Sequence, residues 1–151
     1  MDKRYNNHLD SIQIIIDRFF DRQWKWEVIA LYKDKSGVWH GEMCITKTKG
    51  KGSNSYEECE NYTLLPKKDW QSAIQKYYDL KFDTLPNMKD IKGSDFKVRD
   101  GVMNTFTYRH KEKSRRVEYQ SPDLFKKKSW QTANATEILE IHQKYFVKKR
   151  N

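Results

Sequence analysis

Residues 62–86 read YTLLPKKDWQSAIQKYYDLKFDTLP, and residues 96–122 read FKVRDGVMNTFTYRHKEKSRRVEYQSP. In the first stretch, apolar and aromatic residues recur at i, i+4, i+7 and i+8 from Trp70. This spacing predicts an amphipathic helix that begins at Pro66 and ends near Phe82. In the second stretch an Asp-Gly turn separates two β-rich runs, a signal typical of a hairpin. A helix followed by antiparallel strands indicates an α+β fold.

The N-terminal half predicts a helix followed by an antiparallel meander. Asp10 and Gln13 form a capping-box pattern, and the apolar residues behind them recur at helical spacing, so we expect a helix over residues 10–20. The β-branched run at residues 14–16 leaves a strand open as the alternative. From Trp24 the apolar period changes to two, and Gly-bearing polar turns follow. The expected strands cover residues 24–32, 38–46 and 56–65.

The C-terminal half predicts a second meander and a closing helix. The expected strands cover residues 96–99, 102–109 and 115–120. Asn134 and Glu137 repeat the capping-box pattern ahead of a helical stripe that ends near Phe146. No internal repeat or linker divides the sequence, so residues 1–151 are expected to form a single α+β domain. We expect this domain to contain two antiparallel meanders and about three packed amphipathic helices.

The composition is strongly basic. The 151 residues include 30 Lys and Arg and 21 Asp and Glu, which gives a net charge of +9. Such a surplus attracts polyanions without specifying one. No run approaches the roughly 18–20 apolar residues of a membrane span. The polar start lacks the apolar region of a signal peptide, so the sequence as written predicts a cytoplasmic protein, whereas earlier removal of a signal would indicate an extracytoplasmic one.

Cys44 and Cys59 are the two cysteines of the chain. If the strands around them fold about the loop at residues 50–52, Cys44 lies directly opposite Cys59, and a two-residue slip makes them diagonal neighbours on the same face. Two hypotheses stay open: a cross-strand disulfide in an oxidising compartment, and a pair of reduced thiols. Neither cysteine belongs to a spacing typical of a metal site, so we expect no metal.

Four polar residues suit a general acid–base site of the kind a small nuclease uses. They are His40, Glu42, Arg109 and Glu118. Catalytic groups need close approach and shifted pKa values, which a sequence does not reveal. Polar alternation on the wet face of a sheet explains the same four residues without catalysis. Since nucleotide-binding and nucleophile motifs are also absent from the sequence, we expect no cofactor and favour a non-catalytic protein.

Basic residues gather in clusters with aromatic residues between them, an arrangement that suits nucleic-acid binding through phosphate contacts and base stacking. The candidate contacts are Lys49, Lys51, Lys111, Lys113, Arg115, Arg116, Lys126, Lys127 and Lys128. The alternative interpretation is a solvated lysine-rich surface with the aromatic residues inside. Because no recognition-helix or RNP-type pattern accompanies the clusters, we favour the solvated surface.

The order of motifs in the C-terminal two-thirds resembles that of small uncharacterised bacterial α+β proteins. In these, a helix precedes a Leu-Pro element, and an Asp-Gly pair opens a β-meander that ends near a proline. The matching residues here are Leu85, Pro86, Asp100, Gly101, Val117, Tyr119 and Pro122. The resemblance implies the same fold and an exported location, and no activity or site transfers with it.

By elimination, a small charged domain without catalytic motifs is expected to be a binding or accessory protein. The leading hypothesis is binding to a protein partner, with an inhibitor or immunity-type role as one form of it. Electrostatic nucleic-acid binding is the alternative, and a small nuclease-like enzyme ranks third. A protein-binding module predicts an exposed apolar patch of roughly several hundred Å² on one face of the sheet.

Overall fold

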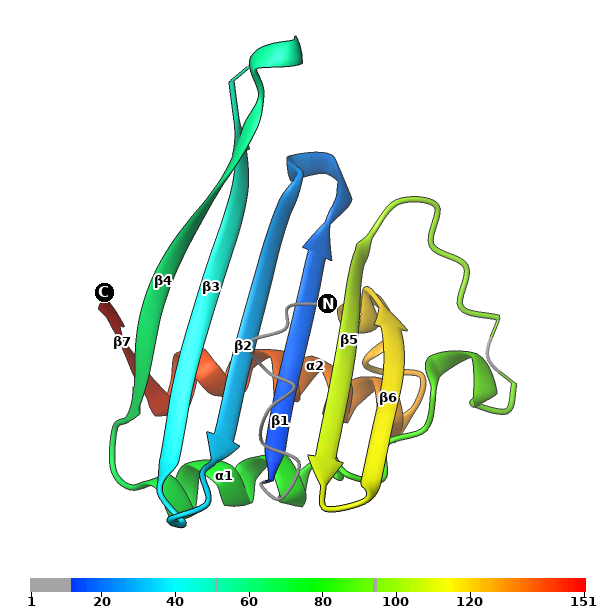
Figure 1. Cartoon of the computed structure of the whole chain (residues 1–151). Helices are drawn as coiled ribbons and strands as arrows, with labels where there is room; N and C mark the ends of the chain where they lie inside the picture. Colours follow the sequence, from blue (N-terminus) through cyan, green and yellow to red (C-terminus); the bar gives the residue numbers. More distant parts are fainter. Residues whose placement is uncertain (1–11, 51, 94) are drawn as a thin grey trace.

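The computed structural model describes residues 12–50, 52–93 and 95–151, which form an antiparallel sheet with two helices on one face (Figure 1). The strands are β1 (Gln13–Phe20), β2 (Lys25–Lys33), β3 (Trp39–Lys49), β4 (Tyr56–Pro66), β5 (Val102–His110), β6 (Lys113–Gln120) and β7 (Phe146–Arg150). The helices are α1 (Trp70–Asp79) and α2 (Trp130–Tyr145). Short 3-10 turns are η2 (Asp21–Gln23), η3 (Gly52–Asn54), η4 (Met88–Asp90) and η5 (Pro122–Phe125). The α+β class is as expected, with two α-helices in the described residues in place of three.

Strand β1 joins what the sequence predicted as two separate meanders. It pairs with β2 on one side and with β5 on the other, so the seven strands form one sheet in the order β6-β5-β1-β2-β3-β4-β7. Helix α2 crosses behind this sheet from the β6 side to the β7 side, and α1 lies behind the lower end of the strands (Figure 1). The prediction of two meanders is therefore wrong.

The segment predicted as the first helix is the central strand β1. Ile14 and Ile16 are fully buried against the helices, and Ile15 on the other face is 9% exposed. A central strand has neighbours on both sides and buried residues on both faces, and β-branched residues such as this isoleucine run are favoured there. The helical spacing of the apolar residues therefore does not reflect a helix. Asp10, the predicted cap, lies outside the described residues.

Both described helices begin at a capping residue that the sequence analysis did not identify. Asp69 caps α1, because its carboxylate accepts a hydrogen bond from the Ser72 backbone N–H at 2.7 Å. Pro66 ends β4 instead of starting the helix. Ser129 caps α2, while the predicted cap Asn134 lies inside the helix and donates from its side chain to the Leu80 carbonyl at 3.0 Å.

The Asp-Gly pair is not the turn of a hairpin. Residues 96–101 contain no strand, and Gly101 lies where the chain enters β5. A Cβ atom at Gly101 would lie 2.4 Å from Oγ of Ser121, and that same Oγ accepts the Val102 backbone N–H at 3.0 Å. Glycine is required here for close approach of two chain segments. The β5–β6 hairpin turns instead at residues 111–112.

The core lies between the helices and the face of the sheet that they cover. Its largest fully buried apolar side chains are Ile14, Ile16, Ile29, Leu31, Leu64, Tyr77, Leu85, Phe106, Tyr119, Ile138 and Ile141. The Tyr119 hydroxyl also donates to the Pro86 carbonyl at 2.7 Å, which fastens the segment after α1 to β6. Neither described helix has the length and apolar character that crossing a membrane requires.

Candidate functional site

The face of the sheet opposite the helices, here called the open face, carries a row of large apolar side chains. Met103 of β5 and Trp26 of β2 both pair with Phe19 of β1, so these three residues lie side by side. The ring centroids of Phe19 and Trp26 are 5.9 Å apart, and Trp24 extends the row with its ring 6.5 Å from Phe19. We call these four residues the apolar stripe.

The apolar stripe is exposed although its members are large. The exposed fraction is 68% for Trp24, 49% for Trp26 and 37% for Met103. Trp24 adopts the left-handed backbone conformation at the end of η2, and its N–H donates to the Asp21 carbonyl at 3.3 Å. The Trp26 side chain hydrogen-bonds to half-buried Asp17, whose pKa is raised because burial outweighs both the charge of Arg116 and that hydrogen bond. A local hydrogen bond thus holds the backbone of Trp24, and another holds the side chain of Trp26.

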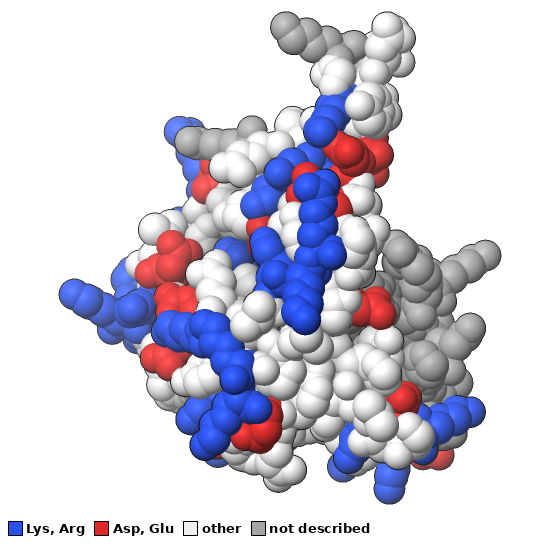
Figure 2. Space-filling view, turned by 90° about the vertical axis from the view of Figure 1, so that its left-hand side faces the viewer, with Lys and Arg blue, Asp and Glu red and all other residues white. Residues whose placement is uncertain are grey.

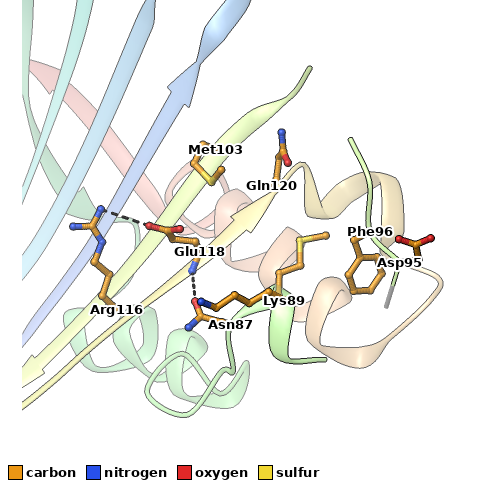
Figure 3. A pocket seen from close by; sticks show the side chains of 9 residues that line it. Asn87, Lys89, Asp95, Phe96, Met103, Arg116, Glu118 and Gln120 are labelled. Atoms are coloured by element: carbon orange, nitrogen blue, oxygen red, sulfur yellow. Dashed lines mark hydrogen bonds and ion pairs between the residues drawn. The ribbon is translucent and has the colours of Figure 1, made fainter. Parts of the chain in front are cut away.

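The apolar stripe runs into a cavity of about 560 Å³ at the β6 side of the open face (Figure 3). We call this cavity the edge pocket. Strands β5 and β6 form one wall, and the segment after α1 forms the other. The lining residues are Asn87, Met88, Lys89, Asp95, Phe96, Met103, Arg116, Glu118 and Gln120. Since Met103 belongs to both features, the apolar stripe and the edge pocket form one continuous surface.

The edge pocket combines three apolar side chains with a larger number of polar and charged ones. The Glu118 backbone N–H donates to the Asn87 side-chain oxygen at 2.9 Å, which fastens the pocket segment to β6 (Figure 3). The Arg116 guanidinium lies 3.9 Å from the Glu118 carboxylate, and both groups are more than half exposed. Met88 and Phe96 supply apolar surface. A few apolar side chains beside charges of both signs suit reversible binding of an amphipathic side chain.

The four residues that suited an acid–base site do not come together. Arg109 of β5 and His40 of β3 lie in one row but three strands apart, which is about 14 Å at the usual strand spacing. Glu118 of β6 lies four strands from Glu42 of β3, or about 19 Å. These separations are too large for a shared reacting atom.

His40 and Glu42 belong instead to a local network beside the β2–β3 turn. Nε2 of His40 lies 2.7 Å from the Asp34 carboxylate, and Glu42 accepts a hydrogen bond from the Tyr32 hydroxyl at 3.0 Å. The pKa of Asp34 is lowered, first by the Ser36 hydroxyl and then by His40. The network stabilises the turn and explains these side chains without catalysis.

The predicted nucleic-acid contacts are divided among separate parts of the molecule. Lys49 ends β3 at the β3–β4 hairpin, whereas Lys111 and Lys113 lie at the β5–β6 turn, at the opposite end of the sheet (Figure 1). Arg115 and Arg116 are adjacent on β6 and therefore point to opposite faces. The segment between η5 and α2 carries Lys126, Lys127 and Lys128. Lys51 lies outside the described residues.

A further basic surface follows β7, a strand that the sequence analysis did not predict. Figure 2 shows Lys and Arg side chains along the β4–β7 edge, with Asp and Glu among them. The Lys148 ammonium lies 4.4 Å from the centre of the Tyr62 ring, and Lys49 forms an ion pair with Glu58. β7 has five residues and follows α2 directly, so no apolar period could distinguish it from a helix tail.

Cys44 and Cys59 are diagonal neighbours on the open face. β3 and β4 pair Cys44 with Asn61 and Thr46 with Cys59, so the directly opposed register is wrong and the two-residue slip applies. The structure joins the two residues by a disulfide, with their Cα atoms 6.0 Å apart. That separation is ordinary for a disulfide.

His142 lies at the C-terminal end of α2 and is 8% exposed. Burial lowers the pKa of His142, and the charge of Arg18 lowers it further while Glu27 opposes this. The folded protein therefore binds fewer protons than the unfolded chain just below the ordinary histidine pKa of about 6.5. Stability contributed by neutral His142 is present above that pH and is lost as the pH falls.

We expect the free energy of unfolding to decrease between about pH 7.5 and pH 5.5, and His142→Gln to reduce this slope. Urea unfolding at fixed ionic strength measures the effect. His110→Gln is the matched control, because His110 lies at the distant β5–β6 turn and should leave the slope as it is. If the free energy of unfolding changes equally with pH in the wild type and in His142→Gln, His142 is not the group responsible for the pH dependence.

Comparison with protein families, with curated proteins and with solved structures finds no match to this chain. Within the described ranges, no group of three or more His, Cys, Asp and Glu side chains is placed to hold a metal ion. We therefore infer the function from the surfaces and cavities of the chain itself. The apolar stripe had a sequence signal in the alternation from Trp24 onward, but Phe19 and Met103 join it only once β1 is a strand.

Proposed function

We propose that this chain is a non-catalytic binding protein that docks another protein on the apolar stripe and the edge pocket. One observation carries the proposal: large apolar side chains lie exposed in a continuous row that ends in a cavity of about 560 Å³. Single exposed apolar residues are ordinary on protein surfaces, whereas a contiguous row beside a pocket is typical of an interaction site.

The residue types support protein binding. Trp and Met are enriched at the centres of protein interfaces, where burial of a large side chain contributes most of the binding energy. Trp26 is held by its hydrogen bond to Asp17, so little conformational entropy is lost when a partner covers it. Met103 adapts to the shape of an incoming group because its exposed side chain is flexible.

The chemistry of the edge pocket indicates what the partner presents. An apolar side chain of the partner fills the space between Met88, Phe96 and Met103. Charged groups beside it pair with Arg116 and Glu118 at the exposed rim. The partner is therefore a protein segment with an apolar residue flanked by charged ones, and inhibition or immunity is one form that such binding takes.

Removing the apolar stripe is expected to weaken partner binding by about 30-fold or more, the effect of losing an interface hot spot. The test compares wild type with the double variant Trp26→Ser and Met103→Ser by affinity capture, followed by Kd measurement with the purified captured protein. Trp130→Ser is the matched control, because Trp130 is 55% exposed but lies at the start of α2, away from the open face.

Equal capture and equal Kd for the wild type and the double variant would overturn the proposal. Electrostatic nucleic-acid binding is the second candidate, favoured by the basic β4–β7 edge in Figure 2. It predicts binding of labelled single-stranded RNA that weakens steeply with salt and is unchanged in the double variant, since phosphate contacts do not use the apolar stripe. The two functions thus predict different results for the double variant: weaker binding of a protein partner in the first case, and unchanged binding of RNA in the second.

A further inference from the structure

A second concave site lies on the other face of the sheet, beside the C-terminal end of α2. It is a cavity of about 390 Å³ lined by residues of β1, β2, β3, β4, α2 and β7, and we call it the charged cavity. Its volume falls within the range of small-molecule pockets. It shares no residue with the apolar stripe or the edge pocket, so it is independent of the proposed function.

Charged side chains from β1 and β2 meet in the charged cavity. The Arg18 guanidinium lies 3.4 Å from the Glu27 carboxylate, and Lys25 pairs with the same carboxylate. The side chains of Arg18, Lys25 and Glu27 are 18%, 24% and 9% exposed, respectively. Exposed Lys148 of β7 lines the cavity at a distance from this cluster, with its ammonium against the Tyr62 ring. Arg18 and Lys25 thus share the Glu27 carboxylate, which leaves one positive charge in excess among these three partly buried side chains.

The polar groups of the charged cavity are held in place before any ligand arrives. Nε of Arg18 donates to the Asn104 side-chain oxygen at 3.3 Å. Asn104 is 1% exposed and donates in turn to the carbonyls of Val102 and Tyr119, each at 3.0 Å. A guanidinium fixed by a buried amide is oriented for binding a carboxylate.

A buried polar atom in the charged cavity also lacks a hydrogen bond of ordinary geometry. This atom is Nδ1 of His142, and the Leu139 backbone interacts with the same ring. His142 is 8% exposed and lines the cavity. Since buried polar atoms in proteins are almost always hydrogen-bonded, an atom left without such a bond beside an excess positive charge indicates a place for a ligand.

Apart from Gln143, the remaining lining residues of the charged cavity are apolar. Met43, Ile45, Leu64 and Phe146 line it, and all four are at most 7% exposed. We propose that the charged cavity binds a small organic monoanion, with its carboxylate at Arg18 and Lys25 and its apolar body on these four residues. A compact multivalent anion fits less well, because it gains nothing from the apolar surface and is repelled by Glu27.

The test is calorimetric titration of the full chain with sodium octanoate, 1-octanol and inorganic phosphate at low ionic strength. We expect octanoate to bind, octanol to bind at least about tenfold more weakly, and phosphate to bind more weakly than octanoate. The double variant Lys25→Gln and Lys148→Gln is expected to weaken octanoate binding by at least about tenfold. These two lysines are not in the core, so the variant is expected to fold.

The matched control is the double variant Lys33→Gln and Lys149→Gln, which removes the same charge from the same two strands outside the cavity. It should bind octanoate as the wild type does. A second variant, Arg18→Met with Lys25→Gln and Glu27→Gln, removes both ion pairs without leaving one of their charges unpaired and should abolish binding. The proposal is overturned by absence of octanoate binding, by equal binding of octanol, by tighter binding of phosphate, or by equal losses in the cavity and control variants.

Discussion

Ile141→Asp is expected to abolish the cooperative unfolding transition of this protein at 25 °C. Ile141 lies on α2 and is 2% exposed, within the layer between the helix and the sheet. The substitution removes buried apolar surface and places a carboxylate among the apolar side chains of the core. Together these effects cost at least about 4 kcal/mol, comparable with the roughly 5–15 kcal/mol that holds a domain folded.

Circular dichroism and urea titration of the purified variant measure this effect. Ile141→Val is the graded control, because it removes one methylene and should cost only about 0.5–1.5 kcal/mol. Gln143→Asp introduces the same carboxylate at an exposed position two residues further along α2 and should remain folded. Native-like melting of Ile141→Asp would show that α2 does not pack on the sheet as described.

Loss of the Cys44–Cys59 disulfide is expected to lower the free energy of unfolding by about 3 kcal/mol, the typical value for a loop of this size. The bond joins β3 to β4 across 15 residues of sequence, which include the loop at the hairpin tip. Without it, the unfolded chain gains conformational freedom that the folded hairpin does not have. Urea unfolding of the oxidised wild type and of the double variant Cys44→Ala and Cys59→Ala measures the difference.

Reduced wild type should unfold at the same urea concentration as the double alanine variant, since both lack the cross-link. Alkylation followed by mass measurement checks the redox state directly. If both thiols of the folded, unreduced protein react and added reductant leaves the stability unchanged, the two cysteines are free thiols. Protection from alkylation in freshly lysed cells would in turn indicate an oxidising compartment.

Patterns confined to neighbouring residues predicted their elements well. The alternation from Trp24 onward predicted β2, and the helical spacing from Trp70 predicted α1, because each pattern reflects one face buried on one partner layer. The Asp-Gly pair and the Asn134 capping box were misleading. Each is a local signal that competes with a tertiary contact, to Ser121 in the first case and to Leu80 in the second.

The candidate site was predictable only in part. Trp24 and Trp26 alternate with buried residues in the sequence, but their exposure depends on which face of the sheet the helices cover. The edge pocket brings Met88 and Phe96 against Met103, and no spacing in the sequence relates the segment after α1 to β5. The predicted basic clusters, in contrast, lie on several surfaces, since proximity in sequence does not place side chains on one face of a sheet.

The sequence by itself determined the α+β class, most of the strands, the helix α1 and the nearness of Cys44 to Cys59, because period, turn residues and hairpin register act over a few residues. Only the tertiary structure decided that the isoleucine run is the central strand, since a β-branched segment becomes a strand when neighbours pair with both of its edges. The charged cavity likewise exists only in the folded chain. Arg18 and His142 are 124 positions apart in sequence (142 minus 18), and packing of α2 on β1 and β2 brings them together.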